Sequence, residues 1–600
     1  MRKIILICTY CCIQSLLTAQ PAITYTRQEA MIPMRDGVKL YTVIFTPSAT
    51  ELSPILMMRT PYGSEHTRSP EKSAYVKDMA EEGYIFVTQD IRGRYKSEGQ
   101  FVMNRPILDK AGEVDESTDT WDTIDWLINN IKNNNGKVGQ LGISYLGWTT
   151  LVAAARPHPA LKAASEQATP ADMYLGDDFH HNGAFRLSYG FDYSFMEEAS
   201  KVDTLFPFDN YDLYSWFLKL GPLSNANDKY LHSKLPTWNN FVAHPNYDAF
   251  WQKQSAFKYV GYPRIPMLHV GGVWDQEDIN GPQEIYKLQE KLDSNNRNYI
   301  CLGPWNHGQW GGGDVTHLAG YDMGGNTAHY FQQNIQKKWF DHWLKGKDDG
   351  TFAEANIFET GSNQWKTYTS WPPKEATIKK LYTAANGKVS FDKPAAAEGY
   401  DEYVSDPAKP VPYRQRPVEQ TYGINSRWYT WLAEDQRFVD GRPDVATWQS
   451  DTLTDDITVA GSIIAHLFAG TTGSDADWVV KLIDVYPDKM PGNIKMSGYE
   501  LMVASEVFRG RYRKSFTTPE AITPDQPEEY TINLHQIDHK FLKGHRIMIQ
   551  VQSSWFPCID MNPQKYVPNI YEAKASDYQK ATQRIYRSGK YATYIALPVL

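Results

Sequence analysis

The amino-acid sequence predicts a doubly wound α/β domain with a mostly parallel sheet, an inserted helical cap and a C-terminal all-β domain. Short apolar runs alternate with helical periodicity between residues 35 and 165, and this alternation returns from about residue 266. Between about 172 and 255 it gives way to irregular, aromatic-rich helical stretches. Beyond about residue 352, short alternating segments separated by Pro, Gly and Asp turns indicate a β sandwich.

The same periodicities locate individual elements. Apolar residues at i, i+3 and i+4 spacing predict an amphipathic helix from Thr120 to Lys132, and a second helix is expected from about Pro282 to Leu292. Five apolar runs are expected to be strands of the sheet: 55–58, 84–87, 138–141, 266–270 and 299–302. The expected domains are a signal peptide (1–19), the first part of the α/β domain (20–171), the cap (172–255), the second part of the α/β domain (256–351) and the β domain (352–600).

The N-terminus has the pattern of a cleavable secretory signal. Arg2 and Lys3 precede an apolar run from Ile4 to Leu17, and the small residues Thr18 and Ala19 follow it before Gln20. A membrane anchor is the alternative, but the run is shorter than the ~20 residues that a spanning helix needs. We therefore expect cleavage near Ala19 and a secreted or periplasmic protein with no membrane span in the mature chain.

Charge and cysteine content exclude several classes of function. The formal net charge of -9 is small for 600 residues, and no cluster of Lys and Arg is interleaved with aromatic residues, so a nucleic acid is not an expected partner. After cleavage only Cys301 and Cys558 would remain, which allows one disulfide but no disulfide framework. Cys301 stands in an apolar run and is expected to be a buried thiol.

A candidate nucleophile follows one of the predicted strands. In Gly142-Ile143-Ser144-Tyr145-Leu146-Gly147, Ser144 stands between a strand and the helix-like run 148–155. This is the place of the serine in the G-x-S-x-G turn, although the second glycine comes one residue late. The motif by itself is only moderately specific, because Gly-x-Ser turns are common.

Two further residues complete the order Ser, acid, His that an α/β hydrolase requires. Asp275 and His307 each follow a later predicted strand, in Trp274-Asp275 and in Asn306-His307-Gly308. Alone, such an Asp is usually a helix cap and such a His is usually structural. Together with Ser144 they predict a cofactor-independent serine hydrolase, in which Asp275 orients His307 and activity rises as His307 loses its proton near pH ~6.5.

Two donors are expected to stabilise the oxyanion. One is the backbone N–H of Tyr145, the residue after the nucleophile. The other is the phenol of Tyr62, which stays protonated near neutral pH and can donate a hydrogen bond. A tyrosine at the position of Tyr62 is, however, more often a packing residue.

Five segments together resemble one family: Arg59-Thr60-Pro61-Tyr62, Gln89-Asp90-Ile91-Arg92-Gly93, the Ser144 turn, Trp274-Asp275 and Gly303-Pro304-Trp305-Asn306-His307. They are similar to the cocaine esterase, Xaa-Pro dipeptidyl-peptidase and α-amino-acid ester hydrolase family, over nearly the whole mature chain. The resemblance implies an α/β hydrolase domain with an inserted helical cap, an all-β jelly-roll C-terminal domain and self-association. It assigns Ser144, Asp275 and His307 to the triad, and Tyr62 and Tyr145 to the oxyanion hole.

Within this family the sequence looks most like the α-amino-acid ester hydrolases, which resemble acylases of β-lactam antibiotics. The likeness implies that Asp178, Glu277 and Asp278 hold the α-ammonium group of the substrate. Converging acids repel one another unless a cation joins them, which agrees with this role. Leu146 departs from those hydrolases, which commonly carry an acid there, so the acyl substrate stays open.

Other functions remain open. Xaa-Pro dipeptidyl-peptidase, general carboxylesterase and acylase activities would use the same triad on a small ester, amide or short peptide, and a carbohydrate- or surface-binding protein is the non-enzymatic alternative. A metal site is not expected. Its candidate ligands Asp177, Asp178, His180 and His181 would point apart on one helix.

Overall fold

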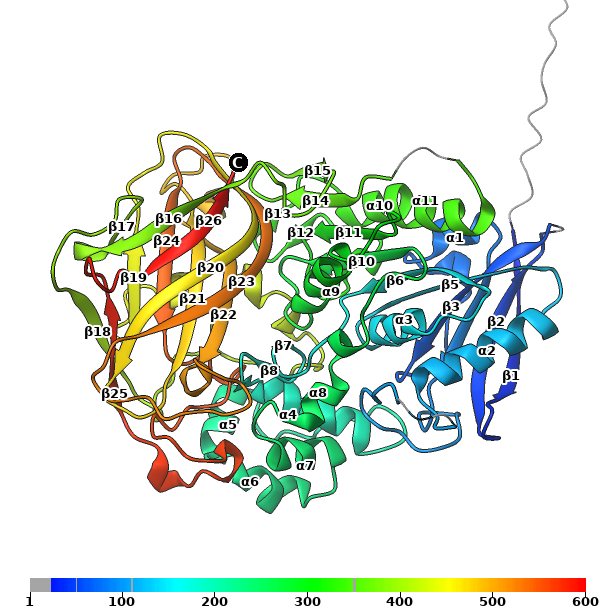
Figure 1. Cartoon of the computed structure of the whole chain (residues 1–600), viewed down its shortest axis with the longest axis horizontal. Helices are drawn as coiled ribbons and strands as arrows, with labels where there is room; N and C mark the ends of the chain where they lie inside the picture. The colour runs from blue at the N-terminus through cyan, green and yellow to red at the C-terminus, as the bar shows by residue number, and fades with distance from the viewer. Residues whose placement is uncertain (1–22, 50, 109, 111, 349–351) are drawn as a thin grey trace, which may run out of the picture.

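The computed structural model describes residues 23–600 except 50, 109, 111 and 349–351. The predicted signal peptide, residues 1–19, lies outside the described residues. Figure 1 shows two sheet-based domains side by side, with the α/β domain on the right and the C-terminal β domain on the left. Helices α4–α8 lie along the lower side of both domains in this view. None of the helices in the described part of the chain is long and apolar enough to cross a membrane.

The α/β domain contains a ten-stranded sheet that is parallel from β4 to β14 and antiparallel at both edges. All five strands expected from apolar runs are present, with ends that differ by a few residues. In spatial order the strands are β1 (Tyr25–Pro33), β2 (Lys39–Pro47), β4 (Ile85–Asp90), β3 (Ser53–Thr60), β5 (Asn134–Ile143), β6 (Leu161–Gln167), β10 (Met267–Gly272), β11 (Asn298–Gly303), β14 (Ala355–Glu359) and β15 (Gln364–Tyr368).

Both faces of this sheet are buried. Successive residues of β3, Ile55 and Leu56, belong to two separate hydrophobic clusters, as expected where side chains alternate between faces. The expected helix at 120–132 is α2, which begins four residues earlier because Asp115 caps it: its side chain accepts from the Thr118 N–H. The helices of this domain are α1 (Lys77–Ala80), α2 (Glu116–Asn130), α3 (Tyr145–Ala155), α9 (Asn280–Glu290), α10 (Thr327–Phe331) and α11 (Lys337–Phe340).

An insertion separates β6 from β10. It starts with a small three-stranded sheet, continues through helices packed by aromatic rings, and returns to the main sheet. Its elements are β7 (Gly176–Asp177), β8 (His180–His181), β9 (Ala184–Phe185), α4 (Leu187–Glu198), α5 (Leu213–Leu220), α6 (Ser224–Ala226), α7 (Pro236–Ala243) and α8 (Ala249–Gln254).

The C-terminal part is a β domain, as predicted, built on an eleven-stranded sheet that is antiparallel except between β17 and β19. Short strands β12 (His317–Leu318) and β13 (Tyr321–Asp322) form a separate hairpin in the segment before it. The strands of the large sheet are β16 (Thr377–Ala384), β17 (Lys388–Ser390), β18 (Tyr400–Ser405), β19 (Val445–Gln449), β20 (Ile457–Thr471), β21 (Asp477–Val485), β22 (Glu500–Arg509), β23 (Glu528–Phe541), β24 (Arg546–Gln552), β25 (Ala581–Tyr586) and β26 (Tyr594–Val599).

Candidate active site

Ser144 occupies a strained turn between β5 and α3. Its backbone has φ 66° and ψ -130°, a conformation that side-chain-bearing residues rarely adopt. The two flanking glycines make the turn possible. A Cβ atom on Gly142 would come within 2.4 Å of the Leu146 Cβ, and one on Gly147 would come within 2.5 Å of the Gln167 carbonyl oxygen on β6. The glycine that comes one residue late therefore lets α3 pack closely against the neighbouring strand.

Asp275 and His307 lie together on loops after β10 and β11. The distances from His307 Nδ1 to the two Asp275 carboxylate oxygens are 2.9 and 3.1 Å. Asp275 Oδ1 also accepts from the backbone N–H groups of Glu277 and Asp278, each at 2.9 Å. These bonds hold the buried carboxylate in place, so the predicted acid and base have the expected relation.

The pKa of His307 differs from the sequence-based expectation. Burial opposes its protonation, but the carboxylates of Asp275 and Glu277 outweigh burial and raise its pKa to about 9. The expectation of an ordinary value near ~6.5 was therefore wrong for the free enzyme. It omitted the second carboxylate: Glu277 Oε2 lies 3.5 Å from His307 Nε2.

Tyr62 and Tyr145 lie beside Ser144, as predicted. Burial, together with Glu197, raises the pKa of Tyr62 well above its usual value, and its phenol contacts the Ser144 side chain. The Tyr62 hydroxyl also shares a 3.0 Å hydrogen bond with the Tyr193 hydroxyl. The Tyr145 phenol accepts a 2.9 Å bond from the Asn104 N–H, and the backbone N–H of Tyr145, the expected donor, lies in the first turn of α3.

The three predicted substrate-binding carboxylates converge. Asp178 comes from the turn between β7 and β8, and its N–H donates to Asp278 Oδ1 at 3.4 Å. Glu277 and Asp278 stand two and three residues after Asp275. All three side chains are buried, with relative exposures of 2, 3 and 0%.

The negative charge of these three carboxylates is poorly compensated. Burial and the neighbouring Glu277 raise the pKa of Asp178 to about 6, although a hydrogen bond from Tyr189 lowers it. Burial and the neighbouring acids raise the pKa of Asp278 well above its usual value, and its Oδ2 has no hydrogen-bond partner among the described residues. The guanidinium of Arg186 lies nearby, but it donates to the backbone carbonyls of Asp178, Gln276 and Glu277. A cation entering the cluster would therefore be stabilised.

Sequence reasoning missed the residues that position these acids. The Tyr189 hydroxyl donates to Asp178 Oδ1, and Trp428 Nε1 donates to Glu277 Oε1 at 2.6 Å. The Tyr189 and Trp428 rings are stacked, with centroids 5.8 Å apart. Their only signal in the sequence is the density of aromatic residues, because neither stands in a motif.

The alternative metal ligands do not converge, and the expected helix at 177–181 was wrong. The segment is the hairpin β7–β8, with Asp177 paired to His180. Asp177 accepts backbone N–H groups of residues 171, 172 and 281, whereas His180 bonds with the Tyr571 hydroxyl at 2.8 Å. The short strands hold Asp178 at the turn between them, facing Glu277 and Asp278.

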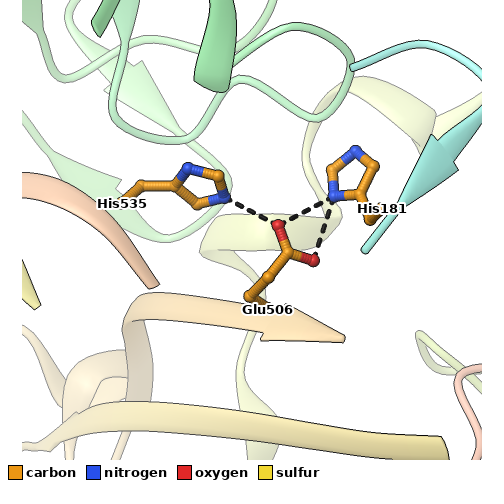
Figure 2. Close-up of side chains that lie close together, drawn as sticks. All are labelled: His181, Glu506 and His535. Atoms are coloured by element: carbon orange, nitrogen blue, oxygen red, sulfur yellow. Dashed lines mark hydrogen bonds and ion pairs between the residues drawn. The ribbon is translucent and has the colours of Figure 1, made fainter. Parts of the chain in front are cut away.

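His181 instead joins the insertion to the β domain, as Figure 2 shows. Glu506 on β22 lies 2.9 Å from His181 Nδ1 and 2.8 Å from His535 Nε2 on β23. These are hydrogen-bond lengths, and they are shorter than the separation of about 3.3 Å that tetrahedral zinc with bonds of ~2.0–2.1 Å would impose on its ligand atoms. Despite burial, the two histidines lower the pKa of Glu506 to about 2. The group is a hydrogen-bonded bridge around one carboxylate.

Cys301 and Cys558 are both buried free thiols, so the disulfide that the sequence allowed is not formed. Burial raises the pKa of each thiol. Neither is therefore a ready nucleophile that could compete with Ser144.

Comparison with known proteins identifies the family. Residues 36–309 match the X-Pro dipeptidyl-peptidase (S15 family), and residues 347–596 match the X-Pro dipeptidyl-peptidase C-terminal non-catalytic domain. A cocaine esterase of Rhodococcus sp. (strain MB1 Bresler) is 28% identical over 95% of this chain and 98% of its own length.

Two solved structures are more similar. An α-amino acid ester hydrolase is 44% identical, with a TM-score of 0.93 over 99% of this chain and 100% of its own. An aminopeptidase from a marine sediment Thaumarchaeota archaeon is also 44% identical, with a TM-score of 0.93 over 96% of each chain. The chain is therefore an enzyme, a serine hydrolase with an α/β hydrolase fold that belongs to the family of X-Pro dipeptidyl-peptidases and cocaine esterases.

Proposed function

We propose that the enzyme hydrolyses esters or amides of α-amino acids through an acyl-enzyme on Ser144, with the substrate α-ammonium group held by Asp178, Glu277 and Asp278. One observation carries the proposal: three buried carboxylates converge next to the base, and the nearby guanidinium of Arg186 donates to backbone carbonyls and not to these carboxylates. A substrate ammonium supplies the missing charge.

We propose a two-step reaction on these residues. His307 Nε2 accepts the Ser144 hydroxyl proton as the oxygen attacks the scissile carbonyl, while Asp275 stabilises the imidazolium through Nδ1. The Tyr62 hydroxyl and the Tyr145 N–H donate to the oxyanion. His307 then returns the proton to the departing alcohol or amine. Water, deprotonated by the same imidazole, hydrolyses the acyl-enzyme and regenerates Ser144.

The position of the cluster explains why an α-amino group suits the site. Glu277 and Asp278 follow the triad acid by two and three residues, so the cation site adjoins the base. An ammonium one carbon away from the scissile carbonyl is held there with that carbonyl near Ser144. Binding of the charge therefore also orients the reacting group.

We propose two kinds of leaving group. The similarity to an α-amino acid ester hydrolase supports esters. We include β-lactam antibiotics among the candidates where their acyl group carries a free α-amino group. The equally similar aminopeptidase supports a second candidate, the N-terminal residue of a short peptide, because its free amine would occupy the same carboxylate cluster. We also propose that α4–α8 form a cap over this cluster, and that the mature protein is exported after cleavage near Ala19.

A substrate panel tests the proposal. Specificity constants are compared for phenylglycine methyl ester, its N-acetylated form, phenylglycine amide and an Xaa-Pro amide. We expect the free amino ester to be at least tenfold better than its acetylated form, since acetylation removes a charge-assisted contact worth about 1.5–3 kcal/mol. Equal rates on the two esters would reject the ammonium site and favour a general carboxylesterase.

A further inference from the structure

We propose that Glu277 restrains the base His307 in the free enzyme, and that the substrate ammonium releases it by taking the Glu277 carboxylate. Binding of an α-amino ester would thus turn His307 into an active base. This inference rests on the proposed function, because it gives the ammonium site a second role in addition to binding.

The first step concerns the nitrogen that must accept the serine proton. His307 Nε2 is buried and has no hydrogen-bond partner among the described residues, while Glu277 Oε2 lies 3.5 Å away. On the other side of the ring, Nδ1 is bonded to Asp275. A carboxylate therefore faces each nitrogen, an arrangement that favours the doubly protonated imidazolium, and this form cannot take a proton from Ser144.

The second step concerns the fixed orientation of Glu277. Its Oε1 accepts from Trp428 Nε1 at 2.6 Å and from Gln276 Nε2 at 3.0 Å, and its backbone N–H donates to Asp275. The other oxygen, Oε2, is left facing the imidazole. The carboxylate is thus held toward the base by three bonds.

The third step concerns the charges around His307. Two more acids approach the ring: Asp278 Oδ2 lies 4.0 Å from Nδ1, and Asp178 adds its charge from the β7–β8 turn. The guanidinium of Arg186, at the start of α4, donates to backbone carbonyls and not to these carboxylates. The acids therefore outweigh the cation, in agreement with the raised pKa of His307.

The substrate changes this balance in two ways. Its ammonium adds a positive charge beside the imidazolium and donates to Glu277 Oε2. Both effects favour loss of the Nε2 proton to solvent, which leaves a neutral imidazole and an occupied ammonium site. A neutral ester binds without releasing that proton, so it is discriminated against in turnover as well as in affinity.

The test compares phenylglycine methyl ester with methyl phenylacetate, the same ester without the amino group. For wild-type enzyme we expect the acid limb of kcat to lie at least one pH unit lower for the amino ester. In Glu277→Gln the restraint is lost, so kcat/KM for methyl phenylacetate at pH 7 should rise about tenfold for each unit by which the His307 pKa falls, whereas the amino ester should become worse.

Asp178→Asn is the matched control. It removes one charge from the same cluster, but Asp178 makes no ion pair with His307 among the contacts of the described residues, so it should impair the amino ester and raise the rate on methyl phenylacetate far less. A Glu277→Gln enzyme that loses activity on both esters, with an unchanged acid limb on methyl phenylacetate, would overturn the restraint.

A second measurement needs no variant. Methylammonium chloride should accelerate wild-type hydrolysis of methyl phenylacetate at pH 7, because the small cation can occupy the carboxylate cluster beside the neutral ester. Tetramethylammonium chloride at equal ionic strength controls for salt, since it has no N–H donor. Inhibition or no effect by methylammonium contradicts the inference. A different result would reject the proposed function itself: equal wild-type specificity constants for phenylglycine methyl ester and methyl phenylacetate.

Discussion

At the residue scale, the active site depends on one strained backbone and one unusual set of charges. Ser144 keeps its positive φ because glycines at 142 and 147 leave room for the turn. His307 lies among acids to which we assign two roles: Asp275 would orient the base, and the cluster beyond it would hold a substrate cation.

Removal of the nucleophile or the base should abolish turnover. We expect Ser144→Ala and His307→Ala each to lose on the order of 10⁶ in kcat, because triad residues act as a unit, and Asp275→Asn to lose less. Steady-state kinetics measure the loss, and circular dichroism checks that the fold persists. A Ser144→Ala enzyme that retains a tenth of wild-type activity would reject Ser144 as the nucleophile.

Tyr62→Phe separates an oxyanion donor from a binding residue. Its hydroxyl faces Ser144 and stays protonated, so its loss should lower kcat by roughly 10²–10³ with little change in KM. The assignment fails if KM alone changes.

At the element scale, α4 connects the two halves of the site. Tyr189 and Tyr193 stand one helical turn apart, and their hydroxyls bond to Asp178 and to Tyr62 respectively. The same helix therefore supports the proposed ammonium site and the proposed oxyanion donor.

Two conservative variants of α4 should thus have different signatures. Tyr189→Phe removes a donor from Asp178, so we expect about a tenfold lower kcat/KM for phenylglycine methyl ester and little change for methyl phenylacetate. Tyr193→Phe should lower kcat for both esters, because it disturbs Tyr62. Identical effects of the two variants on both esters would show that α4 acts only through packing.

The sequence predicts elements well where a local period exists. Strands β3, β4, β5, β10 and β11 and helices α2 and α9 follow from apolar patterns, whereas β6 and β14 of the parallel sheet were not predicted. The proposed triad follows from its order along the predicted strands. The hairpin β7–β8 was missed because strands of two residues carry no period. Trp428 could not be anticipated either, since it reaches Glu277 across 151 positions of the chain.

At the scale of the whole molecule, buried polar groups join the insertion to the β domain. Glu506 bridges His181 and His535, and Asp560 accepts the Phe185 N–H while it pairs with Arg509. Breaking one partner of such a buried pair is costly, so the domains should behave as one unit in unfolding.

The burial of His180 predicts that the folded protein loses stability in acid. Burial lowers the pKa of His180 to about 3, so below pH ~6.5 the unfolded chain binds a proton there that the folded chain excludes. Stability is complete above pH ~6.5 and falls with pH, by about 2 kcal/mol at pH 5 from this group. Melting temperatures at pH 5 and 7 should differ less in His180→Gln than in wild type. An equal difference in both proteins would contradict this origin.

The central claim is that Ser144 is acylated by substrates whose free α-ammonium occupies the carboxylate cluster. Rapid mixing with phenylglycine methyl ester, acid quenching after a few milliseconds and peptide mass spectrometry would locate the acyl group directly. We expect a phenylglycyl adduct on the peptide that contains Ser144, and at most a tenth as much adduct from the N-acetylated ester at equal concentration. An adduct on another residue, or equal labelling by the two esters, would contradict the account.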